Sequence, residues 1–281
     1  MPVITFCSNT TKETGKTFSI AALATYMAIE HNYKILLIST SYNDKSLSEC
    51  FWNDKKKKSF LDSIVDTNKI DLDSGIEGIY KIAKSNRLTP EVIGNYTRIV
   101  FKDRLDVLES PNTKIREDYM AIRAYYKDII KTADRFYDLI LVDLDGNIQD
   151  TITREIFNIS NIIVMNIIQN KNVVDNYIAE LQGDLGRIKR KIIPLIGKCD
   201  PESKYSVKNI ARYINQKDIT VEVPYNILFA ESCSEGKIVD YFFKVMRMKG
   251  MDKNVVFVEA LKNLTSIVVE KIKTLQQMKK I

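Results

Sequence analysis

Short apolar runs alternate with longer segments of helical period along this 281-residue chain. The short runs are rich in Val, Ile and Leu and have the length of strands that are buried on both faces. This alternation is typical of repeated strand–helix–strand units, which build a parallel sheet covered by helices. We therefore expect a three-layer α/β fold with a mostly parallel sheet of about seven strands, at 3–8, 34–40, 105–109, 139–143, 162–168, 192–197 and 220–223.

The expected helices fill the segments between these strands. The first, at 16–30, carries Phe18, Ala21, Ala22 and Ile29 on one face, which is the period of an amphipathic helix. Further helices are expected at 75–85, 115–133, 173–184, 207–214, 238–248 and 255–279. Because no internal repeat or domain boundary interrupts the pattern, we expect residues 1–281 to form a single domain.

Composition excludes several classes of protein. The formal charge of +6, from 42 basic and 36 acidic residues, is too mild for a dedicated nucleic-acid binder, although it permits an anionic partner. The single histidine, His31, is expected to be a polar helix end. No run of 18 apolar residues and no signal peptide is present, so neither export nor a membrane span is expected. Four widely spaced cysteines indicate no zinc site or disulfide framework and favour a reducing cytoplasm: Cys7, Cys50, Cys199 and Cys233.

The segment between the first expected strand and the first expected helix resembles a phosphate-binding loop. Gly15, Lys16 and Thr17 match the end of the GxxxxGK[S/T] template, whose backbone N–H groups cradle phosphate while the lysine meets the outer phosphates and the hydroxyl binds magnesium. Thr10 stands where the template has its first glycine. The flanking strand and helix support the motif, because a helix dipole is positive at its N-terminus. The alternative is a polar helix start with Thr14 as N-cap.

A second candidate motif is FYDLILVDLDGN, residues 136–147, in which an apolar strand ends in Asp143. In the Walker B pattern, a carboxylate at this position holds magnesium or its water. Ligands of parallel sheets bind at the carboxyl ends of the strands, so Asp143 and the loop after Ser8 are expected to share one crevice. Thr17 and Asp143 are therefore the candidate metal ligands. For Asp143 alone, the alternative is a strand-end cap.

The order of these parts resembles the ParA/MinD family of deviant Walker A ATPases over essentially the full length of the chain. The matching segments are TKETGKT at 11–17, KILLISTSYNDKSLSE at 34–49, YDLILVDLDG at 137–146 and VPYNILFAESCSEGKIVDYF at 223–242. The first and the last are the more specific. The resemblance implies a P-loop NTPase fold that binds ATP and Mg²⁺. It also implies nucleotide contacts from Thr11, Lys12, Glu13, Thr14, Gly15, Lys16, Thr17, Phe18, Pro224 and Asn226.

The signature lysine of this family is replaced in the present chain. In relatives it reaches across an ATP-bound dimer to the partner's phosphates, and here its position holds Thr11. Lys12 lies one position later, and with Asp143 it is the candidate catalytic residue. By analogy with arginine fingers, losing such a cation slows phosphoryl transfer by a factor of roughly 10³ or more.

Two aspartates that follow the second strand in the family are also replaced. Their positions hold Ser39 and Ser41, and a serine hydroxyl can hydrogen-bond but brings no negative charge. Asn43 or Asp44, in the following loop, could compensate in part. We therefore expect the chain to bind ATP with Mg²⁺ and to hydrolyse it slowly or not at all.

The resemblance implies an ATP-dependent homodimer that recruits a macromolecular partner. Relatives include DNA partition proteins and the TadZ/CpaE-like branch, which places pilus and secretion machinery at a cell pole, so recruitment to a pole or the nucleoid is expected. Non-specific DNA could contact the basic residues 55–58, 187–191 and 247–253, for which the alternative is a solvated face.

The last residues, EKIKTLQQMKKI at 270–281, place Ile272, Leu275, Met278 and Ile281 on one side. We expect this stripe to pack against the domain rather than to contact a membrane. Two alternatives to an ATP-gated switch remain. One is a nucleotide-independent scaffold with a vestigial ATP site, and the other, less favoured because no second catalytic cluster is apparent, is a small-molecule kinase or ligase.

Overall fold

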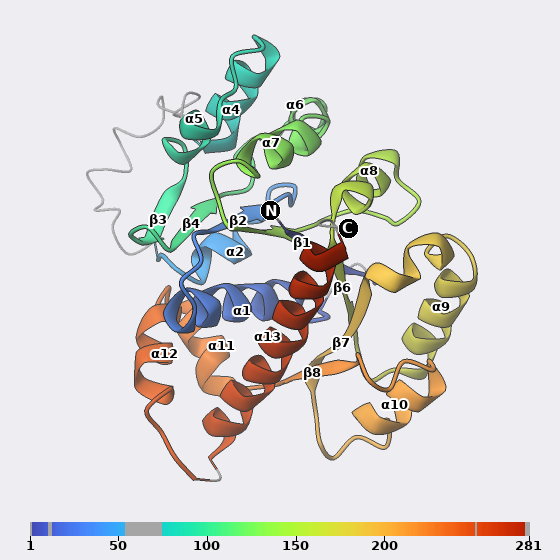
Figure 1. The fold of residues 1–281 in the computed structure, drawn as a ribbon. Coiled ribbons are helices and arrows are strands. Elements are labelled where there is room, and N and C mark those ends of the chain that lie inside the picture. The colour runs from blue at the N-terminus through green and yellow to red at the C-terminus, as the bar shows by residue number, and fades with distance from the viewer. Residues whose placement is uncertain (1, 11–12, 54–74, 251, 279–281) are drawn as a thin grey trace.

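A single sheet forms the centre of the chain, whose computed structural model describes residues 2–10, 13–53, 75–250 and 252–278. Its strand order is β3-β4-β2-β5-β1-β6-β7-β8, and every neighbouring pair is parallel except β3 with β4 (Figure 1). The strands are β1 Val3–Ser8, β2 Ile35–Ser39, β3 Arg98–Phe101, β4 Leu105–Leu108, β5 Leu139–Asp143, β6 Ile162–Ile167, β7 Ile192–Cys199 and β8 Val221–Pro224.

The expected α/β fold and its parallel strands are confirmed, and the sheet has one strand more than expected. The additional strand, β3, is a short edge strand that runs antiparallel to β4. Its Ile99 side chain is 61% exposed, so β3 lacks the buried apolar pattern by which the other strands were predicted.

Helices cover both faces of the sheet (Figure 1). They are α1 Lys16–Glu30, α2 Ser46–Glu49, α4 Gly75–Lys84, α5 Pro90–Gly94, α6 Arg116–Arg123, α7 Tyr126–Ala133, α8 Thr151–Ile159, α9 Lys171–Gln182, α10 Val207–Tyr213, α11 Ile227–Ser234, α12 Ile238–Val245 and α13 Lys253–Met278, with a 3₁₀ segment, η3, at Gly186–Lys191. The sequence pattern missed α2, α5, α8 and α11, which are all short.

The prediction of one continuous helix at 115–133 is wrong. The segment forms two helices, α6 and α7, because the chain tightens at residue 125, whose N–H donates to the carbonyl of Ile122 at 2.9 Å, three residues earlier. Buried residues nevertheless recur with helical period across the break, from Ile122 to Tyr126 and Ile129. The hydrophobic pattern therefore could not reveal where the first helix ends.

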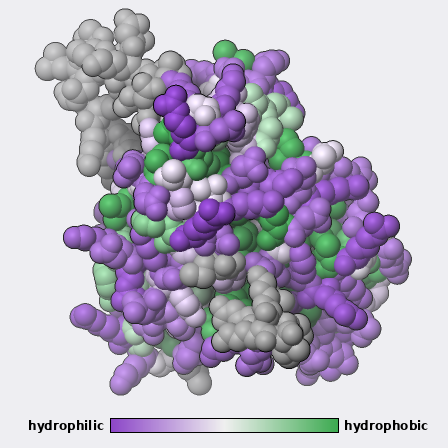
Figure 2. Space-filling view, turned by 45° about the horizontal axis from the view of Figure 1, so that its top comes forward, coloured by the Kyte–Doolittle hydropathy of each residue, from purple (hydrophilic) through white to green (hydrophobic). Residues whose placement is uncertain are grey.

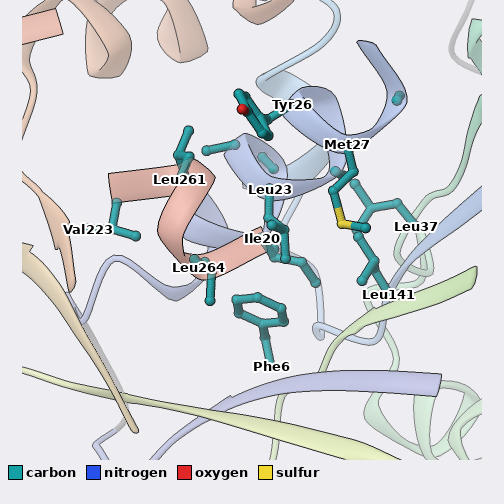
Figure 3. Packing of buried hydrophobic residues seen from close by; sticks show 14 of the residues in the cluster. Phe6, Ile20, Leu23, Tyr26, Met27, Leu37, Leu141, Val223, Leu261 and Leu264 are labelled. Atoms are coloured by element: carbon teal, nitrogen blue, oxygen red, sulfur yellow. The ribbon is translucent and has the colours of Figure 1, made fainter. Parts of the chain in front are cut away.

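Alternate residues of the strands inside the sheet enter two separate hydrophobic cores. On β2, Ile35 and Leu37 face the core that includes α1 and α13, whereas Leu36 and Ile38 face the core that includes α7 and α9. All four are fully buried, as expected for an interior parallel strand. Figure 3 shows side chains of α1 and α13 meeting those of the sheet in the first core.

The C-terminal helix α13 packs against α1 and β8. Of the expected stripe, Ile272 is buried, as are Leu261, Leu264 and Val268 on the preceding turns, so the packing interpretation is confirmed for Ile272. The side chains of Leu275 and Met278, and residue Ile281, lie outside what the structure describes. In the face that Figure 2 presents, hydrophilic residues predominate. Among the described helices, none combines the length and the apolar composition that crossing a membrane requires.

Candidate functional site

The loop between β1 and α1 lies at the carboxyl end of the sheet, next to the ends of β5 and β6. Gly15 is the residue before the helix, in a left-handed conformation with φ of 75°, and its carbonyl accepts the Ser19 N–H at 2.8 Å. No side chain caps the helix, so the predicted alternative with Thr14 as N-cap is wrong. The first backbone N–H groups of α1 are therefore available to an anionic ligand.

Lys16, Thr17 and Asp143 meet at the base of this loop. The Lys16 Nζ lies 2.8 Å from the Asp143 Oδ1 and donates to the Leu144 carbonyl at 2.6 Å. The Thr17 hydroxyl donates to the other carboxylate oxygen at 3.1 Å. Burial alone would lower the pKa of Lys16, but the Asp143 carboxylate raises that pKa above its ordinary value, so the lysine stays charged. The two predicted motifs thus form one charged cluster.

A large pocket opens above this cluster. Its volume is about 840 Å³, which lies in the range of ligand sites that hold a small molecule. Among the described residues, its walls are formed by 8–10, 13–18, 41, 42, 44, 46, 144–149, 180 and 198. Among the described loop residues, the side chains of 8–10 and 13–17 line this space and do not fill it.

The loop after β2 supplies part of the opposite wall. Ser41 lines the pocket, whereas Ser39 is buried and is not among the lining residues. Of the two candidates for compensating charge, Asp44 lines the pocket, but one of its carboxylate oxygens accepts hydrogen bonds from the backbone and the side chain of Ser46. Asp145, in the loop after β5, adds a second carboxylate that the sequence reasoning missed.

Lys198, at the end of β7, is a further pocket residue that the sequence reasoning missed. Its backbone is left-handed, with φ of 49°, which is uncommon for a lysine. A side chain added at Gly15 would come within 3.0 Å of the Lys198 Cγ, and one added at Gly197 would overlap the Thr14 carbonyl oxygen. The end of β7 therefore packs directly onto the phosphate-type loop. A lysine that directly follows an apolar parallel strand was the available signal.

Pro224 and Asn226 lie beside the main pocket, in a narrow groove that also includes Gly15, Phe18 and Lys198. Asn226 is the N-cap of α11, where its Oδ1 accepts the Phe229 N–H at 2.8 Å. Its Nδ2 donates to the Asn254 Oδ1 at 3.0 Å. Both polar ends of Asn226 are therefore engaged within the protein, whereas Phe18 and Pro224 present apolar surface to the groove.

Several buried polar atoms around the loop have no hydrogen-bond partner within the described part of the chain. They are the Asn9 Oδ1, the Thr10 Oγ1 and both side-chain polar atoms of Asn166, which lies in β6 and pairs with Ser8 of β1. Buried polar groups are normally satisfied by protein, water or ligand. Their position beside Ser8 makes this end of the sheet suited to a polar ligand.

A magnesium ion fits the chemistry of the cluster. Thr17 offers a hydroxyl and Asp143 offers a carboxylate, and Mg²⁺ is commonly held by one or two such oxygens together with phosphate and water. Within the residues that the structure describes, no group of three or more His, Cys, Asp or Glu side chains forms a separate metal centre. The predicted residues Thr11 and Lys12 and the basic residues 55–58 lie outside the described part of the chain.

No protein-family model and no curated protein matches the sequence. Solved structures are similar in fold. A ParA family ATPase from Chlorobium tepidum superposes with a TM-score of 0.68 at 17% identity, over 96% of this chain and 98% of that one. A putative plasmid partition protein from Borrelia burgdorferi, bound to AMPPNP, superposes with a TM-score of 0.64 at 16% identity, over 96% of this chain and 99% of that one. The septum site-determining protein MinD from Pyrococcus horikoshii, complexed with Mg-ADP, superposes with a TM-score of 0.63 at 14% identity, over 96% of this chain and 98% of that one. The chain thus has the fold of the ParA/MinD ATPases.

Proposed function

We propose that this chain is a single-domain member of the ParA/MinD family that binds ATP with Mg²⁺ and acts as an ATP-gated, dimeric positioning switch. The observation that carries the proposal is the joining of Lys16, Thr17 and Asp143 at the base of an open pocket of about 840 Å³. Two proteins of similar fold are bound to AMPPNP and to Mg-ADP, which supports a nucleotide of this class as the ligand.

Each residue of the cluster has a separate role in this proposal. The N–H groups at the start of α1 and the Lys16 ammonium receive the phosphates, and a bound Mg²⁺ would neutralise phosphate charge between Thr17 and Asp143. Lys16 must leave the Asp143 carboxylate, 2.8 Å away, to reach a phosphate, so binding exchanges one ion pair for another. Lys198 and Phe18 border both the pocket and the side groove, and we assign them to the nucleoside end of the ligand.

Slow or absent hydrolysis is part of the proposal. Phosphoryl transfer depends on positioned charge, and Ser39 and Ser41 stand where relatives have carboxylates. Asp44 and Asp145 line the pocket, and Asp44 already accepts hydrogen bonds from Ser46. Bound ATP is therefore expected to be hydrolysed slowly or not at all.

Equilibrium titration with Mg-ATP tests the binding step. Wild-type protein is expected to bind with a Kd in the micromolar range, and Lys16→Ala is expected to bind at least tenfold more weakly, because it removes the cation at the base of the pocket. Lys171→Ala is the matched control, since Lys171 is exposed and pairs with Asp175 on α9, away from the pocket lining. Equal and negligible Mg-ATP binding by wild type and Lys16→Ala would contradict the proposed ATP-gated switch.

A nucleotide-independent scaffold is the second candidate. The Lys16–Asp143 ion pair neutralises both groups without a nucleotide, which is compatible with a vestigial site. Size-exclusion chromatography with light scattering separates the two candidates. The switch requires a monomer without nucleotide and a dimer with Mg-ATP, whereas a scaffold is dimeric in both conditions.

We assign the partner to the partition or pilus and secretion class of machinery, with non-specific DNA as a second ligand of the dimer. Arg247, Lys249 and Lys253 are exposed at the end of α12 and the start of α13 and are the candidate DNA contacts. By contrast, Lys191 donates to the Ser160 carbonyl at 2.8 Å and caps α8, so it serves the fold. DNA binding by the dimer is expected to fall steeply with salt, and salt-independent binding would contradict a phosphate contact.

A further inference from the structure

The loop after β5 lines the pocket over residues 144–149 and is held from behind by α6. None of the α6 residues, all of which the structure describes, lines the pocket itself. The last residue of this helix, Arg123, is 6% exposed and points its guanidinium at the loop and at the start of α8. Nothing in the proposed binding chemistry uses this buried cation.

The Arg123 Nη2 is shared among three groups. It lies 2.7 Å from the Asp150 Oδ2, donates to the Asp145 carbonyl at 3.3 Å, and donates to the Thr153 Oγ1 at 3.1 Å. The loop backbone also approaches closely here, because a side chain added at Gly146 would overlap both Nη2 and the Thr153 hydroxyl. One guanidinium thus joins both ends of the loop to α6.

Asp150 is ionised in this arrangement. Burial would raise the pKa of Asp150, but the Thr153 N–H and the Arg123 guanidinium hold that pKa below its ordinary value. Asp150 also caps α8 through the Thr153 N–H at 3.1 Å. Losing Arg123 therefore leaves a carboxylate without its cation at the end of the pocket loop.

A second side chain of α6 reaches the other pocket loop. The Tyr119 hydroxyl donates to the Thr40 carbonyl at 2.8 Å. Thr40 in turn bridges the two loops, since its Oγ1 donates to the Asp143 carbonyl at 3.2 Å and accepts the Asp145 N–H at 2.9 Å. These three hydrogen bonds connect both loops to α6, so a displacement of either loop would disturb the contacts that α6 makes.

We propose that Arg123 is a positioning residue that couples the pocket loop 144–150 to α6, so that occupation of the pocket rigidifies a helix that does not touch the ligand. We call the contacts of Arg123 with Asp145, Asp150 and Thr153 the Arg123 clamp. The coupling rests on the proposed nucleotide binding, whereas the Arg123 clamp on the ligand-free loop does not. By reciprocity, releasing the clamp weakens binding by as much as binding tightens the clamp.

Hydrogen exchange on ligand-free protein tests the clamp. Arg123→Met is expected to speed exchange of amides at 144–154 at least tenfold without changing β1 and β5, and Arg123→Lys is expected to be intermediate, because it keeps the charge but cannot reach three partners. Lys127→Met is the matched control, since Lys127 pairs with Glu155 between α7 and α8 and does not touch the loop. Unchanged exchange at 144–154 in both Arg123 variants would overturn the clamp.

Exchange with saturating Mg-ATP tests the coupling. In wild type, the nucleotide is expected to slow exchange at 116–123, and in Arg123→Met this slowing is lost while the affinity falls about tenfold. Retained slowing at 116–123 in that variant would overturn the coupling. Should wild type bind no nucleotide, the proposed function and the coupling both fall, and the ligand-free measurement still decides the clamp. If Arg123→Met fails to fold, Arg123→Lys and Asp150→Asn serve in its place.

Discussion

Two glycines adapt the end of β7 and the phosphate-type loop to each other. Gly15 has a left-handed backbone and lies against the Lys198 side chain, and Gly197 lies against the Thr14 carbonyl. The conformation of the loop is therefore set from outside the loop as well as by its own sequence. These contacts are present although Thr10 stands where the motif has its first glycine, and the described part of the loop lines an open pocket.

Gly197→Ala tests this contact. The added methyl group would overlap the Thr14 carbonyl oxygen, so the loop must shift. We expect a loss of roughly 1–3 kcal/mol in the free energy of unfolding, by urea denaturation, together with weaker Mg-ATP binding. Gly183→Ala is the control, because the added methyl group would lie at an ordinary 3.4 Å from the Ala179 carbonyl oxygen. Equal effects of the two substitutions would contradict the contact.

The stability of the protein is expected to depend on pH through Glu180, a residue of the pocket wall. Partial burial, and then the nearby Asp184 carboxylate, raise the pKa of Glu180 to about 7. Because the folded state holds this proton more tightly than the unfolded state, the contribution to stability is present below about pH 4.5 and is lost as pH rises toward 7. Thermal unfolding from pH 4 to 8 should show a smaller decline in Glu180→Gln than in wild type. Parallel curves would contradict the shifted titration.

Helices and strands could be predicted from the sequence where their buried residues recur at regular intervals. Seven strands were predicted because their segments are rich in buried apolar residues, whereas β3 was missed because it is a short edge strand with an exposed Ile99. The helices α8 and α11 were also missed, although α10 and α12, which are no longer than these two, were predicted. Lys198 and Asp145 each lie at or just beyond the end of a predicted strand, but which strand ends lie beside the loop depends on the strand order, which the sequence pattern does not give.

The C-terminal helix α13 is expected to stabilise the domain through its buried stripe. Leu264→Ala removes a fully buried side chain between α13 and its neighbours, and we expect it to lower the free energy of unfolding by roughly 2–5 kcal/mol. Lys262→Ala, on the exposed side of the same helix, is expected to change it by less than about 0.5 kcal/mol. Similar losses in both variants, measured by urea denaturation, would contradict this packing.

The whole molecule combines a sheet held by two hydrophobic cores with a pocket at the carboxyl ends of its strands. Lys16 and Asp143 form an ion pair at the base of this pocket. On the proposed function, a phosphate draws Lys16 away from Asp143, so breaking this pair costs part of the free energy of nucleotide binding.

Asp143→Asn is expected to uncouple dimerisation from the metal. The substitution removes the carboxylate that Thr17 and Lys16 contact, and with it the charge that attracts Mg²⁺. In wild type, omitting Mg²⁺ should weaken ATP binding and abolish the ATP-dependent dimer, as measured by light scattering. In the variant, Mg²⁺ should make little difference to either. An unchanged magnesium effect in Asp143→Asn would remove that residue from the metal site.

The most direct test is a crystal structure grown with saturating Mg-ATP. Triphosphate density is expected against the first N–H groups of α1, with the Lys16 Nζ moved from its position 2.8 Å from the Asp143 Oδ1 to a phosphate oxygen. Mg²⁺ is expected between Thr17 and Asp143. A pocket without nucleotide, with the Lys16–Asp143 ion pair still intact at saturating ligand, would contradict the proposed function.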